Sequence, residues 1–156
     1  MSETRVTAAV LGVALVVIYA GASGFWVQTN SSWYLSLHRP SWQPPDVVFG
    51  LIWPYNFIVL GAAMVVAAQR LPLPQLAFTI ALFAVTVGSA TLWSYWFYGP
   101  HLLGWAAVAL AVTAVLTLPL LLSVFSASIP LGWLLVPYQL WIITAATLSW
   151  GYWRLN

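Results

Sequence analysis

Trp33 to Pro45 reads Trp-Tyr-Leu-Ser-Leu-His-Arg-Pro-Ser-Trp-Gln-Pro-Pro, and this stretch is the only long polar interruption in a sequence of apolar runs. Its three prolines fix the backbone φ angle and remove hydrogen-bond donors, so we expect the segment to be stiff. Its two tryptophans and one tyrosine supply broad aromatic surface. A stiff aromatic segment between apolar runs predicts a loop that acts as a lid over a helix bundle.

The composition of the rest of the chain is that of an integral membrane protein. Of the 156 residues, 63% are hydrophobic and 4% are charged, whereas soluble domains carry about 25% charged residues. The mean hydropathy is +0.95, and every charged residue lies near the end of an apolar run. The net charge of +2 is too sparse for nucleic-acid binding, which needs a clustered basic face. The absence of cysteine excludes disulfides and cysteine-ligated metals.

Five apolar runs are long enough to cross a hydrocarbon core of about 30 Å. The turns between the last four are short, which predicts antiparallel neighbours in one bundle. The expected fold is therefore an all-α integral membrane protein, a single domain over residues 1–156 with five transmembrane helices and a structured first loop. The expected spans are Val6–Val27, Asp46–Gln69, Pro74–Tyr98, His101–Phe125 and Pro130–Trp153.

The ends of the spans leave two questions open. Ala20 to Ala22 have the small side chains of a signal-peptide cleavage site, but the apolar run continues through Trp26, which favours a retained helix. The four arginines divide equally between the two sides of the membrane, so the positive-inside rule assigns no orientation.

Most of the eleven tryptophans fall in the half of the bundle nearest the long loop. Interfacial belts are the ordinary expectation for tryptophan, but Trp53 and Trp141 lie well inside their spans. Three spans carry an aromatic stripe on one face by helical spacing. The stripes are Phe49, Trp53, Phe57 and Leu60; Ala90, Trp93 and Phe97; and Trp141, Ala145, Leu148 and Tyr152. They fit either plain core packing or the walls of one cavity for a planar apolar ligand, with Asn56, Ser94, Thr144 and Ser149 as its polar groups.

Small residues recur along one face of the third span. Ala77, Ala81, Ala84 and Gly88 form a ridge suited to close helix contact. The ridge fits a contact within the bundle or the seam of a homodimer.

The sequence does not predict a conventional catalytic or ion-coupling site within the membrane-spanning helices. No span carries an ionisable residue near its middle, which argues against proton coupling and intramembrane hydrolysis. His38 and His101 lie at the loop side, outside the apolar depth, so neither offers a haem ligand within the bundle. We therefore expect no metal site and no required cofactor. If a reaction takes place, its reactive group would belong to the bound ligand.

Four blocks of sequence together resemble the translocator protein family, also called TspO/MBR, tryptophan-rich sensory protein or peripheral benzodiazepine receptor. They are Trp33-Tyr34 with Leu37, Pro40, Trp42, Pro44 and Pro45; Gly50-Leu51-Ile52-Trp53; Thr91-Leu92-Trp93; and Pro137-Tyr138-Gln139-Leu140-Trp141 with Ala145 and Leu148-Ser149-Trp150. The match covers about Trp33 to Asn156, and the first helix fits by position and hydropathy alone.

The resemblance implies a five-helix bundle, often dimeric, that binds porphyrins such as protoporphyrin IX, sterols and synthetic ligands under the first loop. It implies pocket-lining roles for five residues, to which the loop and the stripes add three. The expected ligand-binding set is Tyr34, Trp42, Trp53, Phe57, Trp93, Phe97, Trp141 and Ala145. In some bacterial members the counterparts of Trp53 and Trp141 are implicated in light-dependent porphyrin degradation, so these two are the catalytic candidates if the protein is photochemically active.

The expected function is that of a receptor for protoporphyrin IX-type tetrapyrroles in a bacterial cell membrane. The alternatives are a facilitator that moves porphyrin or sterol-like lipids, and a regulatory or assembly protein with no catalytic role. The pattern Leu148, Tyr152 and Arg154 also fits a loose cholesterol motif. Two departures from the family pattern bear on ligand preference: Ala90 and Ser149 each stand where the family has asparagine.

Overall fold

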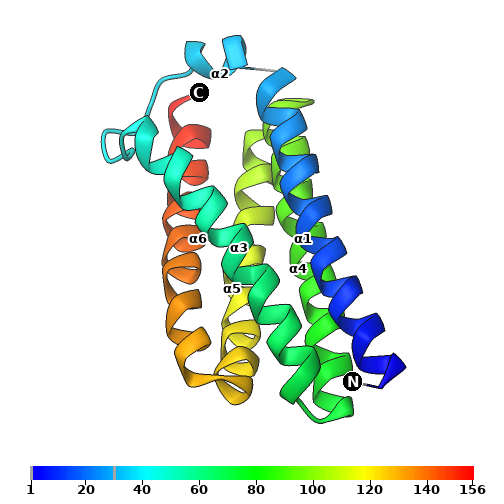
Figure 1. Ribbon diagram of the computed structural model, residues 1–156. Coiled ribbons are helices and arrows are strands. Elements are labelled where there is room, and N and C mark those ends of the chain that lie inside the picture. Colours follow the sequence, from blue (N-terminus) through cyan, green and yellow to red (C-terminus); the bar gives the residue numbers. More distant parts are fainter. Residues whose placement is uncertain (1, 30) are drawn as a thin grey trace.

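The computed structural model describes residues 2–29 and 31–156, which form six helices and no strand (Figure 1). Five of them are long and apolar enough to cross a membrane. These are α1 (Glu3–Thr29), α3 (Asp46–Arg70), α4 (Leu73–Tyr98), α5 (Leu103–Ala127) and α6 (Ile129–Leu155). The predicted all-α membrane fold is confirmed. The sixth helix, α2 (Ser31–Ser36), lies in the first loop and was not predicted.

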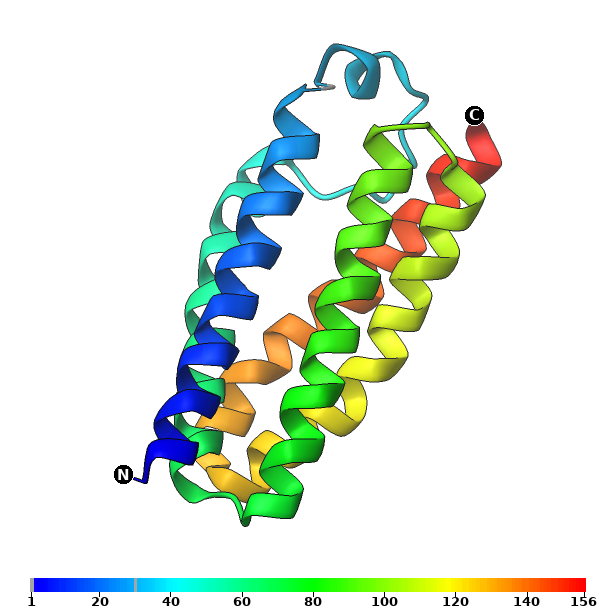
Figure 2. The same ribbon diagram turned by 90° about the vertical axis from the view of Figure 1, so that its right-hand side faces the viewer.

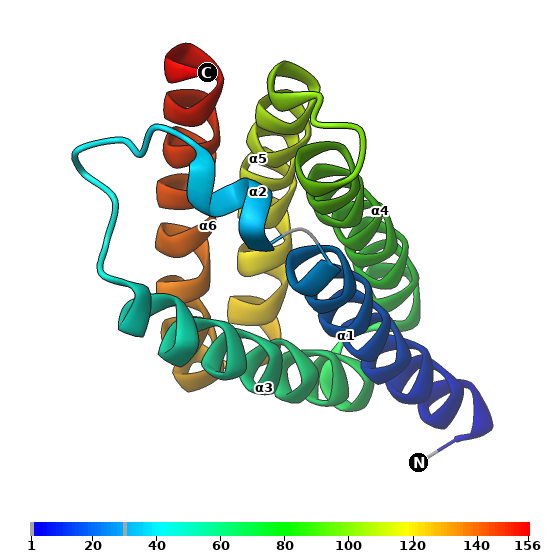
Figure 3. The ribbon, with the colours of Figure 1, turned by 90° about the horizontal axis from the view of Figure 1, so that it is seen from above.

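The five long helices form a ring in the order α1, α3, α6, α5, α4 when viewed from the loop end (Figure 3). Helices α4, α5 and α6 are successive neighbours, as their short turns predict. The turn between α3 and α4 is equally short, but α1 packs against both of these helices far more extensively than they pack against each other. The expectation that α3 and α4 are direct neighbours is therefore wrong, because the first helix lies between them.

Two arginines join helix ends on the side of the bundle opposite the loop, where the N-terminus lies (Figure 2). Arg5 donates from Nη1 to the carbonyl of Ala68 at 2.6 Å and from Nη2 to that of Leu71 at 3.0 Å. Arg70 donates to the carbonyl of Ala127 at 3.4 Å. The last carbonyls of a helix have no partner within the helix, and cations are favoured at this end. The two side chains therefore tie α1 to α3 and α3 to α5.

The half of the ring away from the loop is tightly packed. A Cβ on Gly12 of α1 would lie 2.5 Å from the Cβ of Met64, so glycine is what allows α1 and α3 to approach this closely. Met64, Phe83, Leu120 and Leu135 are each at most 1% exposed and belong to one core cluster. Interiors at this density resist changes of even one methylene.

The first loop is fixed to the ends of α4, α5 and α6. The Trp33 indole stacks on the His101 imidazole, with centroids 3.7 Å apart and 9° between the planes. His101 adopts a φ of 59° in the turn between α4 and α5. The backbone N–H of His38 donates to Asn156 Oδ1 at 2.9 Å, and Asn156 Nδ2 donates back to the His38 carbonyl at 3.2 Å. The predicted stiff lid thus has at least two separate attachments.

The small-residue ridge on α4 faces outward. Ala77, Ala81, Ala84 and Gly88 are all exposed, and a Cβ on Gly88 would meet nothing within 4 Å. The interpretation of the ridge as a contact within the bundle is therefore wrong.

Candidate functional site

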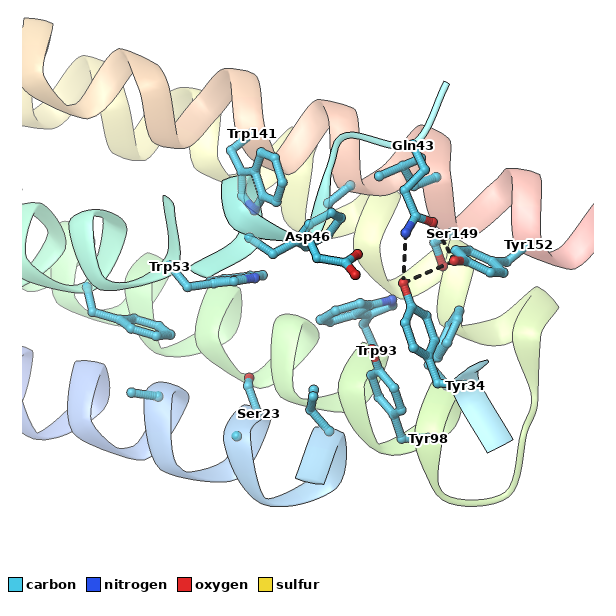
Figure 4. A pocket seen from close by; sticks show the side chains of 18 residues that line it. Ser23, Tyr34, Gln43, Asp46, Trp53, Trp93, Tyr98, Trp141, Ser149 and Tyr152 are labelled. Atoms are coloured by element: carbon cyan, nitrogen blue, oxygen red, sulfur yellow. Dashed lines mark hydrogen bonds between the residues drawn. The ribbon is translucent and has the colours of Figure 1, made fainter. Parts of the chain in front are cut away.

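A cavity of about 420 Å³ lies within the ring beneath the first loop (Figure 4). Among the described residues, α1, α3, α4 and α6 supply its walls and the first loop supplies its roof, whereas α5 supplies none. The lining residues are Ala20, Ser23, Gly24, Val27, Tyr34, Gln43, Asp46, Phe49, Trp53, Phe57, Trp93, Phe97, Tyr98, Trp141, Ala145, Leu148, Ser149 and Tyr152. The volume lies within the range of about 300 to 1,000 Å³ found for small-molecule sites.

The aromatic stripes of α3, α4 and α6 converge on this cavity. Trp141 meets the Trp53 ring edge to face at a centroid distance of 6.4 Å, and it meets Phe49 in the same way at 5.0 Å. Trp53 stacks on Phe57 at 5.6 Å with 26° between the planes. Such pairs stabilise one another beyond their buried area. The stripes therefore pack against each other and present aromatic walls to the same space.

Seven of the eight predicted binding residues lie together at this cavity, and their role in ligand binding stays a prediction. They are Tyr34, Trp53, Phe57, Trp93, Phe97, Trp141 and Ala145. The placement of Trp42 in the pocket is wrong. Its side chain is 56% exposed and closes over Gly151 of α6 together with Pro40, because the proline-rich loop passes around this helix.

The roof of the cavity is a network of hydrogen bonds between three side chains. The Tyr152 hydroxyl donates to the side-chain oxygen of Gln43 and lies 3.0 Å from the Tyr34 hydroxyl. The Gln43 amide nitrogen donates to the Tyr34 hydroxyl at 3.3 Å. The network joins α2, the proline-rich segment and α6. It holds the lid in one position over the aromatic walls.

The cavity walls also carry polar atoms without hydrogen-bond partners among the described residues. These are the indole nitrogens of Trp93 and Trp141 and the hydroxyls of Ser23 and Ser149. Buried polar groups are nearly always paired. These four atoms are themselves covered by neighbouring protein atoms, so the accessible surface of the cavity is mainly apolar.

Of the four polar residues expected at the cavity, only Ser149 lines it. Asn56 and Ser94 are fully buried away from it, and Thr144 donates to the carbonyl of Leu140 at 2.9 Å. Ala90 is also fully buried and does not line the cavity. The alanine at this position therefore forms no part of the cavity wall.

Sequence reasoning missed the wall formed by α1 and the polar residues Gln43 and Asp46. The run of small residues from Ala20 to Gly24 was the available signal for α1, because small side chains leave space beside the aromatic stripes. Asp46 was interpreted only as a helix start. Among the described residues, no group of three histidine, aspartate or glutamate side chains is placed to hold a metal ion.

Comparison with known proteins agrees with this architecture. A model of the TspO/MBR family matches residues 9–154. The chain is 30% identical to protein CrtK of Rhodobacter capsulatus over 88% of this chain and 86% of that protein. It is 32% identical to tryptophan-rich protein TspO of Chlorobaculum tepidum over 94% of this chain and 92% of that protein. It is 29% identical to the translocator protein of Sus scrofa over 80% of this chain and 75% of that protein.

Proposed function

This chain belongs to the TspO/MBR family of membrane proteins, and from that premise we propose that it is a receptor for porphyrins of the protoporphyrin IX type in a bacterial cell membrane. The ligand would bind in the cavity beneath the first loop and could degrade there under light. Other planar hydrophobic molecules would compete for the same site.

The observation that carries the proposal is the convergence of three aromatic walls on one cavity of about 420 Å³. A macrocycle with two flat faces gains stacking contact from Trp53, Trp93 and Trp141, and aromatic stacking contributes about 1 to 3 kcal/mol per ring in other planar ligands. The contact would therefore be mainly one of aromatic faces, with Tyr34, Gln43 and Tyr152 as the polar side chains of the roof. No side chain of the pocket needs to bind a metal for this interaction.

Light-dependent degradation would use dioxygen as the oxidant. The excited porphyrin transfers its energy to dioxygen, which adds across a carbon–carbon double bond of the macrocycle. That bond breaks, each of its carbons gains one oxygen atom as a carbonyl, and no further proton or electron donor is required. Trp53 and Trp141, whose ring centroids are 6.4 Å apart, would hold the macrocycle in place during this step.

A titration of the purified protein with protoporphyrin IX in the dark, followed by illumination of the same sample, tests the proposal. We expect saturable quenching of tryptophan fluorescence, then a loss of the porphyrin absorbance band that is faster than in empty micelles. Trp53→Phe should slow this loss. Trp133→Phe is the matched control, because Trp133 is 66% exposed and does not line the cavity. Absence of saturable binding would refute the receptor, and equal photochemical rates in both variants would refute the role of Trp53.

We also propose that the protein forms a homodimer through the outward ridge on α4. Ala84→Leu combined with Gly88→Leu would place two bulky side chains on the exposed face where small residues permit close helix contact. We expect the dimer dissociation constant to rise about tenfold or more, which corresponds to about 1.4 kcal/mol. Particle mass in lipid nanodiscs measures this. Ala111→Leu on the exposed face of α5 is the control, and a dimer that survives the double substitution would place the seam elsewhere.

A further inference from the structure

Asp46 carries the only charged side chain among the residues that line the cavity. It lies in the first turn of α3, and no side-chain hydrogen bond caps that helix. In the close-up view its carboxylate points into the space between the indoles of Trp53 and Trp93, below Gln43 (Figure 4). A carboxylate is therefore presented to any ligand that enters between the aromatic walls.

The negative charge of the Asp46 carboxylate is only partly balanced by positive groups of the protein. Its nearest cation is Arg39, whose Nη1 lies 3.7 Å from Asp46 Oδ1. Charge-assisted hydrogen bonds between nitrogen and carboxylate oxygen are about 2.7 to 2.9 Å long, so this contact is a loose ion pair. Among the described residues, no hydrogen bond to the Asp46 side chain accompanies it. Both side chains are reached by solvent, with 40% of Arg39 and 79% of Asp46 exposed.

The surroundings of the carboxylate also favour a positive partner. The π faces of tryptophan attract cations, and Trp53 and Trp93 line the same cavity as Asp46. The start of a helix favours an anion, but Asp46 itself already supplies that anion. A ligand carboxylate placed at this position would meet a like charge.

We propose that Asp46 selects the charge of the ligand: the cavity prefers planar aromatic molecules that carry a protonated nitrogen or strong N–H donor at the edge facing the first turn of α3. This inference rests on the proposed function, because it assumes that planar ligands occupy the cavity. It also assigns an orientation to a porphyrin there, since the propionates must point away from Asp46.

The test uses 9-aminoacridine, a planar cation at neutral pH, and acridine, which has the same three rings and is uncharged. Binding of both is measured by fluorescence with the full-length protein in neutral detergent. We expect wild-type protein to bind 9-aminoacridine about fivefold more tightly, the upper end of what a largely exposed ion pair supplies. Asp46→Asn should bring the two affinities to within about twofold of each other, while Asp46→Glu should keep most of the preference.

Glu3→Gln is the matched control, because it removes the same charge from an exposed side chain at the opposite end of the bundle. If the Glu3→Gln protein prefers the cation as strongly as wild type does, the preference does not arise from the net charge of the protein alone. A preference that persists in Asp46→Asn, or is absent from wild type while acridine still binds, would overturn the inference and leave the receptor intact. If neither acridine nor protoporphyrin IX binds wild-type protein, the inference and the proposed function fail together.

Discussion

Trp141→Ala is expected to weaken protoporphyrin IX binding about 5- to 150-fold, because the loss of one stacking aromatic ring costs about 1 to 3 kcal/mol. Trp141 is 6% exposed, and its ring contacts Trp53 and Phe49 at the wall of the cavity. Removing it both deletes a ligand contact and frees the rings that it holds in place. Fluorescence titration in the dark measures the dissociation constant.

The same substitution also opens space in the core, where deletion of a buried tryptophan costs about 3 to 5 kcal/mol of stability. Trp141→Phe separates the two effects, since it keeps an aromatic face and most of the packing. We expect this variant to bind with an intermediate affinity and to melt close to wild type. Trp133→Ala on the exposed surface is the control. Wild-type affinity in a folded Trp141→Ala protein would remove Trp141 from the binding site.

Gly151→Leu is expected to dislodge the first loop from α6. A Cβ at this position would lie 2.8 Å from Pro40 Cγ and 2.8 Å from Trp42 Cζ2, and both atoms belong to stiff rings. Overpacking of this kind costs about 1 to 3 kcal/mol. A displaced loop would also strain the hydrogen bonds that join Gln43 to Tyr34 and Tyr152. We expect the porphyrin to dissociate about tenfold faster, equivalent to about 1.4 kcal/mol, as measured by stopped-flow displacement.

Gly50→Leu is the control for this substitution, because a Cβ on Gly50 of α3 would meet nothing within 4 Å. It changes the same residue type in a transmembrane helix without touching the loop. An unchanged dissociation rate in a Gly151→Leu protein whose melting temperature has fallen would show that the loop does not retain the ligand.

The helical spacing of aromatic residues predicted three stripes that fitted either core packing or the walls of one cavity, and in the structure residues of all three stripes line the cavity. Trp53, Trp93 and Trp141 were placed on faces of three different spans, and the loop beside them supplied the roof. Spacing can group these residues because large rings at i, i+3 and i+4 positions share one helix face. The resemblance to a known family then singled out Tyr34, which lies in the first loop and belongs to none of the three stripes.

The parts that were not predicted have physical reasons. In a membrane bundle the faces toward lipid and toward the core are both apolar, so hydropathy did not show that Ser23 and Gly24 of α1 face the cavity. The direction of a loop side chain has no period, so Trp42 could not be distinguished from Tyr34. Asp46 matched the ordinary preference for an acid at a helix start, and only the geometry shows that its carboxylate points into the cavity.

The position of α1 between α3 and α4 has a consequence for the order in which the protein assembles. Helices α4, α5 and α6 can pair through short turns as they leave the translocation machinery, because their contacts are local in sequence. The ring closes only when α1 has met α4 and α3 has met α6, contacts between segments far apart in the chain. The cavity has walls from both ends of the sequence, so its full set of walls is present only after α1 and α6 have both joined the ring. The moment at which the newly made protein first binds protoporphyrin IX would therefore mark the last step of assembly.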